Sequence, residues 1–118
     1  MAGGQSRKSR VTTHILDTAV GRPARGVAVQ LAARTPDGWQ EIGSGVTDDD
    51  GRIMDLGPSD LAPGEYRLDV EAGAYHRHQQ VDAFFSQLCV GFVIRDADSH
   101  YHVPLLLSPF TVSVYRGS

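Results

Sequence analysis

The sequence contains one cysteine, one lysine and no long apolar run. With a single cysteine, Cys89, no disulfide can form within the chain, so the fold depends on a hydrophobic core. Because Cys89 lies inside the apolar segment Leu88 to Ile94, we expect it to be buried. No segment approaches the roughly 18 apolar residues that a membrane span needs. The formal net charge of −3 argues against a nucleic acid or an anionic membrane as partner.

Several common catalytic and metal-binding patterns are also missing. The chain has no glycine-rich phosphate loop, no paired zinc-binding cysteines and no nucleophile elbow. The acidic run Asp48-Asp49-Asp50-Gly51 lacks the downstream glutamate of a calcium loop, so we interpret it as a solvated turn. Asp98, Ser99 and His100 are the residue types of a catalytic triad, but neighbours on an extended chain point to opposite faces and cannot form a relay.

The first ten residues are polar and basic and contain no apolar stretch of the kind found in a secretory signal. We therefore expect residues 1–10 to form a disordered tail before one domain, residues 11–118, and we expect a cytoplasmic protein. A chain of 118 residues is long enough for one domain that buries roughly 65% of the surface of its unfolded chain.

Apolar residues recur at every second position in several segments, which is typical of β-strands with one buried face. The turn-forming pairs between these segments include Asp50-Gly51 and Pro63-Gly64. The pattern predicts an all-β sandwich or barrel with one short surface helix over residues 73–80. Pro104 predicts an edge or a bulge within its strand. The predicted strands are Val11–Asp17, Val27–Ala32, Trp39–Val46, Tyr66–Val70, Leu88–Ile94, Tyr101–Leu107 and Thr111–Tyr115.

Five histidines are many for a chain of this length, and two pairs have His-x-His spacing. On a strand, His100 and His102 share a face, which is one way in which metal sites on strands are built. His76 and His78 diverge by about 200° on the predicted helix and cannot share a ligand. A zinc site would therefore need a third ligand from another strand, such as His14.

The sequence ends on Tyr115-Arg116-Gly117-Ser118, directly after a segment of strand-forming residues. Two interpretations remain open. The terminus is either part of a site, to which it brings a hydroxyl, a guanidinium and a carboxylate, or a strand that happens to finish there.

Two segments resemble the transthyretin-like family. The first is His14-Ile15-Leu16-Asp17 followed by Gly21-Arg22-Pro23-Ala24, and the second is Tyr101-His102-Val103-Pro104 followed by Leu107-Ser108-Pro109-Phe110. With the strand order between them, the resemblance covers about Val11 to Ser118.

That family comprises thyroid-hormone carriers and 5-hydroxyisourate hydrolases, and four positions separate the two branches. This chain is similar to the hydrolases, with His14, Arg52, His102 and Ser118 at those positions. It departs from the hydrolase pattern at Thr111-Val112, where a small residue and an aromatic residue are usual. We therefore expect a local difference in packing before the terminus.

The resemblance implies a sandwich of two four-stranded sheets with one short helix, assembled as a homotetramer from two edge-paired dimers. It also implies a site in a cleft between dimers, lined by residues of neighbouring subunits. Periodicity agrees with this, because His14 shares a strand face with Leu16, opposite the core-facing Ile15.

The implied reaction is hydrolysis of 5-hydroxyisourate to 2-oxo-4-hydroxy-4-carboxy-5-ureidoimidazoline in urate degradation, with neither metal nor cofactor. His14, Arg52, His102 and Ser118 are the expected catalytic residues, and His14, Arg52, Tyr115 and Ser118 the expected substrate contacts. A histidine, with an ordinary pKa of about 6.5, can deprotonate water or protonate the leaving nitrogen. A planar arginine suits the developing oxyanion. The sequence does not decide which histidine is the base or how broad the substrate range is. The alternative is a small-ligand carrier of the transthyretin type.

Overall fold

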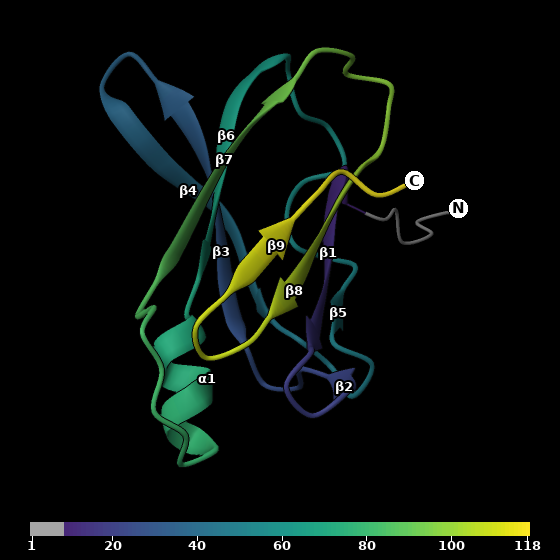
Figure 1. Cartoon of the computed structure of the whole chain (residues 1–118). Helices are drawn as coiled ribbons and strands as arrows, with labels where there is room; N and C mark the ends of the chain where they lie inside the picture. Colours follow the sequence, from purple (N-terminus) through teal and green to yellow (C-terminus); the bar gives the residue numbers. More distant parts are fainter. Residues whose placement is uncertain (1–8) are drawn as a thin grey trace.

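The computed structural model describes residues 9–118, which form two β-sheets packed face to face with one short helix. Figure 1 shows the two layers, with the helix α1 (Ala72–His78) at one end of the sandwich. Residues 1–8, which make up most of the predicted tail, lie outside the described residues. Ser9 and Arg10, the last two residues of that tail, contact the domain, since Ser9 is buried and its hydroxyl accepts a hydrogen bond from the Leu56 N–H.

The first sheet contains five strands in the order β2-β1-β8-β9, with β5 also paired to β1. Because β8 occupies one side of β1 along its whole length, the short strands β2 and β5 follow one another along the other side. Strands β1 and β8 run parallel, and the other pairs are antiparallel. The strands are β1 (Val11–Asp17), β2 (Arg22–Pro23), β5 (Arg52–Ile53), β8 (Tyr101–Leu107) and β9 (Val112–Val114).

The second sheet has four antiparallel strands in the order β4-β3-β6-β7. Its strands are β3 (Ala28–Thr35), β4 (Gly38–Val46), β6 (Gly64–Val70) and β7 (Leu88–Ile94). The predicted all-β sandwich is confirmed. The first sheet differs from the expected four strands because the two-residue strand β5 adds to the edge of β1.

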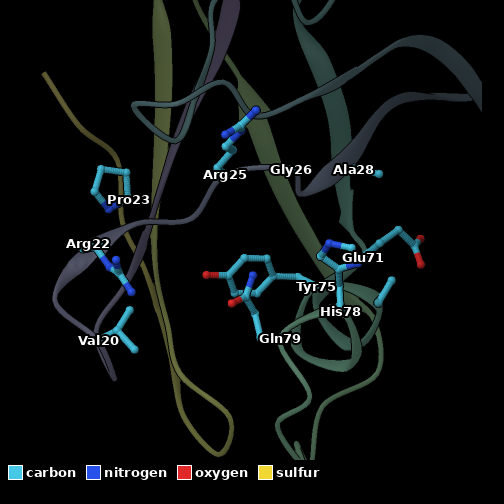
Figure 2. Close-up of a pocket in the computed structure, with 11 residues that line it drawn as sticks. Val20, Arg22, Pro23, Arg25, Gly26, Ala28, Glu71, Tyr75, His78 and Gln79 are labelled. Atoms are coloured by element: carbon cyan, nitrogen blue, oxygen red, sulfur yellow. The ribbon is translucent and has the colours of Figure 1, made fainter.

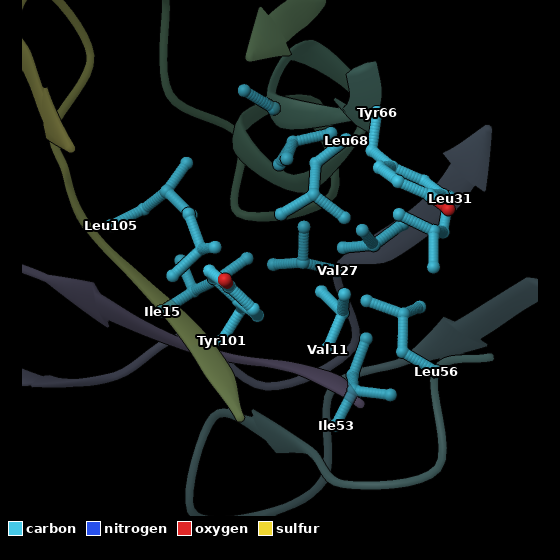
Figure 3. Close-up of a cluster of buried hydrophobic side chains, with 14 of the residues drawn as sticks. Val11, Ile15, Val27, Leu31, Ile53, Leu56, Tyr66, Leu68, Tyr101 and Leu105 are labelled. Carbon is cyan, nitrogen blue, oxygen red and sulfur yellow. The ribbon is translucent and has the colours of Figure 1, made fainter. Parts of the chain in front are cut away.

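The core lies between the sheets and consists of side chains that the period-2 pattern turns inward. Figure 3 shows Ile15 and Leu105 of the first sheet facing Leu31 and Leu68 of the second, and all four are fully buried. Each such side chain contributes about 1.5–3 kcal/mol through removal of apolar surface from water. The opposite face of the first sheet, which carries His14 and Leu16, is left outside this core.

The helix is more buried than the surface helix predicted over residues 73–80, and its bounds differ slightly. It begins at Ala72 and ends at His78, and His76 is buried whereas His78 is exposed, as the helical divergence of the two residues predicts. The Tyr75 hydroxyl donates a hydrogen bond to Oδ2 of Asp17 at 2.7 Å, which fastens the helix to the end of β1. In the described part of the chain no helix is long and apolar enough to cross a membrane.

The expectation that Cys89 is buried is wrong. Cys89 is exposed, because the alternation of β7 turns Leu88 and Val90 inward and Cys89 outward, where a hydrogen bond with Asp69 raises the pKa of its thiol. Pro104 does not make β8 an edge strand, since β8 lies between β1 and β9, but the regular β8–β9 pairing stops at Leu105 and Val114, so the strand is interrupted locally at Pro104. A proline is tolerated there because its nitrogen faces the β9 side, where the regular strand has already ended at Val114.

Candidate functional site

Three of the predicted catalytic residues lie on the outer face of the first sheet. Arg52 of β5 is directly opposite His14 of β1 in an antiparallel pair, so both side chains project from the same face. On the other side of β1, Thr12 is level with His102 of β8. His102 is therefore the diagonal neighbour of His14, and residues from three segments far apart in the sequence converge. We call His14, Arg52 and His102 the histidine–arginine face.

A tight turn before β5 places Arg52 beside His14. Oδ1 of Asp48 accepts hydrogen bonds from the backbone N–H groups of Asp50 and Arg52, each at 2.9 Å. The Arg52 backbone hydrogen bond is the main reason why the pKa of Asp48 is lowered, and the charges of Arg52 and His14 act in the same direction. The acidic run is thus a turn, as expected.

Gly51 is required in this turn. Its φ is +75°, in the region that favours glycine, and a Cβ there would lie 2.3 Å from the Ile15 carbonyl oxygen. The close approach lets the Ile15 N–H donate to the Gly51 carbonyl at 2.7 Å, which fixes β5 against β1. A side chain at position 51 would therefore move Arg52 away from His14.

His102 is half-buried, and its environment favours the neutral ring. Burial lowers the pKa of His102, and the nearby groups His100, His14 and Arg52 lower it further. Nδ1 of His102 lies 2.8 Å from the Thr12 hydroxyl. A neutral imidazole at neutral pH is able to accept a proton from water.

His100 joins the same face but does not complete a metal site. Its ring is stacked on that of His102, with centroids 6.5 Å apart and planes inclined by 13°. Among residues 9–118, no group of three or more histidine, cysteine, aspartate or glutamate side chains is placed to hold a metal ion. The geometry therefore does not support the alternative zinc site of His14, His100 and His102.

The C-terminal segment continues beside β8 after β9 ends. The Gly117 N–H donates to the His102 carbonyl at 2.8 Å, and the two residues form an isolated antiparallel bridge. Ser118 is exposed and follows one residue later, so its Cα lies about 3.8 Å along the chain from the residue that contacts His102. Arg116 turns the other way, and its guanidinium lies 4.4 Å from the centroid of the Tyr101 ring.

Tyr115 lines a cavity of about 420 Å³ at the edges of the two sheets, together with Val93, Tyr101 and Val114. A larger cavity of about 710 Å³ lies between α1 and the segment around β2, and Figure 2 shows Arg22, Tyr75 and His78 around it. Neither cavity is lined by the histidine–arginine face. Within a single chain, that face is an open sheet surface.

Sequence reasoning overlooked two residues that shape this site, Thr12 and Gly117. Thr12 lies two positions before His14 and hence on the same strand face, a signal that was available in the spacing. The role of Gly117 depends on its pairing with His102 across two strands and had no local signal.

We expect Gly117→Ala to impair the site without unfolding the protein. A Cβ at position 117 would lie 2.7 Å from Cδ2 of His102 and 3.0 Å from Cγ of Pro104, so the imidazole must move. A displacement of about 1 Å at a catalytic group can cost about 10²-fold in rate. Steady-state kinetics and the melting temperature measure the two effects. Gly91→Ala is the matched control for the melting temperature, because a Cβ there meets nothing within 4 Å in the same chain. Unchanged kcat in Gly117→Ala would show that His102 tolerates this displacement.

Comparison with known proteins gives consistent matches. The sequence profile of the HIUase/Transthyretin family matches residues 11–117. A curated relative, 5-hydroxyisourate hydrolase 2 of Rhizobium meliloti (strain 1021), is 46% identical over 121 residues, which cover 96% of this chain and 99% of that protein.

Two solved structures are similar throughout the fold. The 5-hydroxyisourate hydrolase of Klebsiella pneumoniae has a TM-score of 0.81 and 35% identity, over 92% of each chain. Sea bream transthyretin in complex with thyroxine has a TM-score of 0.86 and 33% identity, over 92% of this chain and 94% of that one. Backbone similarity therefore does not distinguish an enzyme from a carrier.

Proposed function

The chain belongs to the HIUase/transthyretin family, and from that premise we propose that it is a hydrolase that opens the ring of 5-hydroxyisourate. The observation that carries the proposal is the convergence of His14, Arg52 and His102 on one sheet face. The face provides two histidines for proton transfer and a permanent cation beside them. These groups match the needs of amide hydrolysis at neutral pH.

In the proposed reaction, His102 accepts a proton from water, because its surroundings keep the ring neutral. The water oxygen forms a bond to the ring carbonyl carbon, and Arg52 stabilises the negative charge that develops on the carbonyl oxygen. The carbon–nitrogen bond of the cyclic amide then breaks. A proton passes to the departing nitrogen, and we assign His14 to this transfer because it lies beside Arg52. The products are a carboxylate and an N–H group in the opened ring. The proton taken up by His102 replaces the one that His14 gave to the nitrogen, and the second proton of the water is released from the new carboxyl group.

Tyr115 and Ser118 complete the proposed site as substrate contacts, with Ser118 orienting the water or relaying a proton. The bridge between Gly117 and His102 supports this for Ser118, because it holds the segment beside the catalytic ring. Tyr115 is 54% exposed but lines the cavity of about 420 Å³, away from the histidine–arginine face, so we propose that it contacts a substrate bound at that face of a neighbouring subunit. We also propose that residues 11–118 form one domain and that the protein is cytoplasmic.

The direct test is the ultraviolet decay of freshly generated 5-hydroxyisourate with and without the purified protein. We expect the protein to accelerate the decay in proportion to its concentration. A decay at the spontaneous rate, combined with saturable thyroxine binding, would instead support the carrier. The match to sea bream transthyretin makes the carrier a specific alternative.

We further propose that the active form is a homotetramer, a dimer of dimers, in which a second subunit covers the histidine–arginine face. The edge strands β7 and β9 support edge-paired dimers, because both line the same cavity and expose Val93 and Val114. Unpaired edges of this kind are templates for pairing with another chain. A second copy over the open face would also exclude water from the reacting groups.

If subunits share the site, the activity per subunit should fall when the protein is diluted below the dissociation range of the tetramer. Mass action makes both the assembly and the completed site depend on concentration. Sedimentation velocity and initial rates measured on the same dilution series test this. A monomer with full activity per subunit would contradict the shared cleft.

A further inference from the structure

Thr12 connects two histidine rings through one buried hydroxyl. The residue is 0% exposed, and its Oγ1 lies 2.8 Å from Nδ1 of His102 and 3.2 Å from Nε2 of His100. The connection follows from the topology, because the parallel pairing of β1 and β8 sets Thr12 level with His102. His100 lies directly before β8, two residues from His102, and the two rings are stacked.

Counting protons restricts how these three groups can bond. A threonine hydroxyl has one hydrogen and two lone pairs, so it can donate to only one of the two ring nitrogens and must accept from at least one ring N–H. Three arrangements satisfy this. His102 Nδ1–H donates to Thr12 and Thr12 donates to His100 Nε2, or both of these bonds are reversed, or both rings donate to the hydroxyl oxygen.

The role of His102 selects among these arrangements. A base that takes a proton from water with Nε2 needs its lone pair on Nε2, so the neutral ring must carry its proton on Nδ1. The first and third arrangements provide this tautomer, and only the first uses the hydroxyl hydrogen in a bond between these three groups. The Thr12 backbone also raises the pKa of His102 through a hydrogen bond. Because Thr12→Val and Thr12→Ser both keep that backbone, a comparison of the two variants isolates the hydroxyl.

The other groups that face His102 do not replace this contact. His14 from β1, Arg52 from β5 and His100 from the segment before β8 act on the ring through charge. The C-terminal segment presents Gly117, which has no side chain, and the neighbouring Arg116 is placed over Tyr101. Thr12 is the group bonded to Nδ1.

We propose that Thr12 is a positioning residue that holds His102 in the tautomer with its proton on Nδ1, by donating its own hydroxyl hydrogen to Nε2 of His100. The inference rests on the proposed hydrolase function for its kinetic consequence. It also rests on that function for the choice of tautomer, because the role of His102 as the base selects it, whereas the NMR measurement of the tautomer needs no substrate. The same relay makes His100 a second positioning residue, as the final acceptor.

The experiment compares Thr12→Val, which keeps the shape and removes the hydroxyl, with Thr12→Ser, which keeps the hydroxyl. Thr13→Val is the matched control, because the buried Thr13 hydroxyl donates to the Val103 carbonyl at 2.7 Å on the same pair of strands. Nitrogen-15 NMR of the histidine rings, recorded near pH 8 so that the imidazoles are neutral, reads the tautomer. Ultraviolet decay of 5-hydroxyisourate gives kcat and KM.

We expect His102 to be the Nδ1–H tautomer in the wild-type protein, in Thr12→Ser and in Thr13→Val, and to shift towards Nε2–H in Thr12→Val. The kcat of Thr12→Val should fall roughly 10–100-fold with little change in KM, whereas Thr12→Ser should stay near wild type. His100→Phe, which keeps a stacked ring and removes the acceptor, should cause the same tautomer shift if Thr12→Val does not fold.

A wild-type His102 with its proton on Nε2 would overturn the proposal, and so would a Thr12→Val variant with unchanged tautomer and kcat. If the wild-type protein does not accelerate the decay of 5-hydroxyisourate, the proposed function fails. The NMR measurement still decides the role of Thr12 in that case.

Discussion

Replacing His102 with asparagine should lower kcat by roughly 10²–10⁴, the range for loss of a general acid or base. Asparagine keeps a polar side chain of similar reach but cannot accept a proton from water. The fold should survive, because His102 is half-buried on the outer face of the first sheet and does not belong to the core. Stopped-flow or steady-state decay of 5-hydroxyisourate measures the loss, and the melting temperature is the control for folding.

The pH profile of the wild-type enzyme gives a second test of His102. Because burial and the nearby groups His100, His14 and Arg52 lower its pKa, the ring stays neutral below the ordinary histidine value of about 6.5. The acidic limb of kcat/KM should therefore lie below that value and be absent from the residual activity of His102→Asn. A limb above it would exclude His102 as the base.

The double variant His14→Asn/His102→Asn shows whether the two histidines act together. If they belong to one proton-transfer unit, the double variant should be little worse than the more impaired single variant. Effects that multiply would mean that each histidine stabilises the transition state separately. Full activity in His14→Asn would show that a group other than His14 carries out the second proton transfer.

Replacing Arg52 with alanine should lower kcat/KM by roughly 10²–10³, the loss found when one oxyanion donor is removed. Arg52 lies opposite His14, and its positive charge lowers the pKa of His102. Its guanidinium is the permanent cation of the histidine–arginine face. Arg52→Lys should recover little, because an ammonium group cannot make the planar two-point contact of a guanidinium. Initial rates over a range of substrate concentrations separate kcat from KM.

Arg25 provides the matched control for Arg52. It is an exposed arginine paired with Asp49 at 2.9 Å, and an exposed pair of this kind contributes little to stability. Arg25→Ala should therefore retain wild-type kinetics. Full rescue by Arg52→Lys would show that only the positive charge matters and would reject the two-point contact.

Enzyme and carrier share this fold, so side chains must decide between them. The backbone matches sea bream transthyretin at a TM-score of 0.86 and the Klebsiella pneumoniae hydrolase at 0.81. The histidine–arginine face is what supports hydrolysis. If His102→Asn and Arg52→Ala both kept full activity, the reaction would have to take place elsewhere on the molecule.

Most of the fold could be predicted from the sequence. In a strand with one buried face, the alternation of apolar and polar residues shows which side chains point to the core. Alternation in Val11–Asp17 predicts that Ile15 faces the core and that His14 faces away from it, and both are observed. The same rule explains the exposed Cys89, since its neighbours Leu88 and Val90 take the inward positions. The expectation of a buried Cys89 failed because it relied on overall hydrophobicity and ignored the period of two.

Pairing between strands could not be predicted from these local patterns. A strand has two lateral edges, and its residue pattern does not say which strand will occupy either edge or in what register. Pro104 illustrates the problem, because the missing N–H is compatible with a central strand only when it faces the side where β9 has ended. The two-residue strand β5 is too short to produce a periodic signal at all.

The sequence by itself determined the all-β class, the outward direction of His14 and the residue types available for catalysis. Only the tertiary structure decided that Arg52 lies opposite His14, that Thr12 joins His100 to His102, and that Gly117 packs against His102. The physical reason is that side-chain direction within a strand follows from the local backbone, whereas these contacts depend on hydrogen-bonded pairing between segments as much as 90 residues apart.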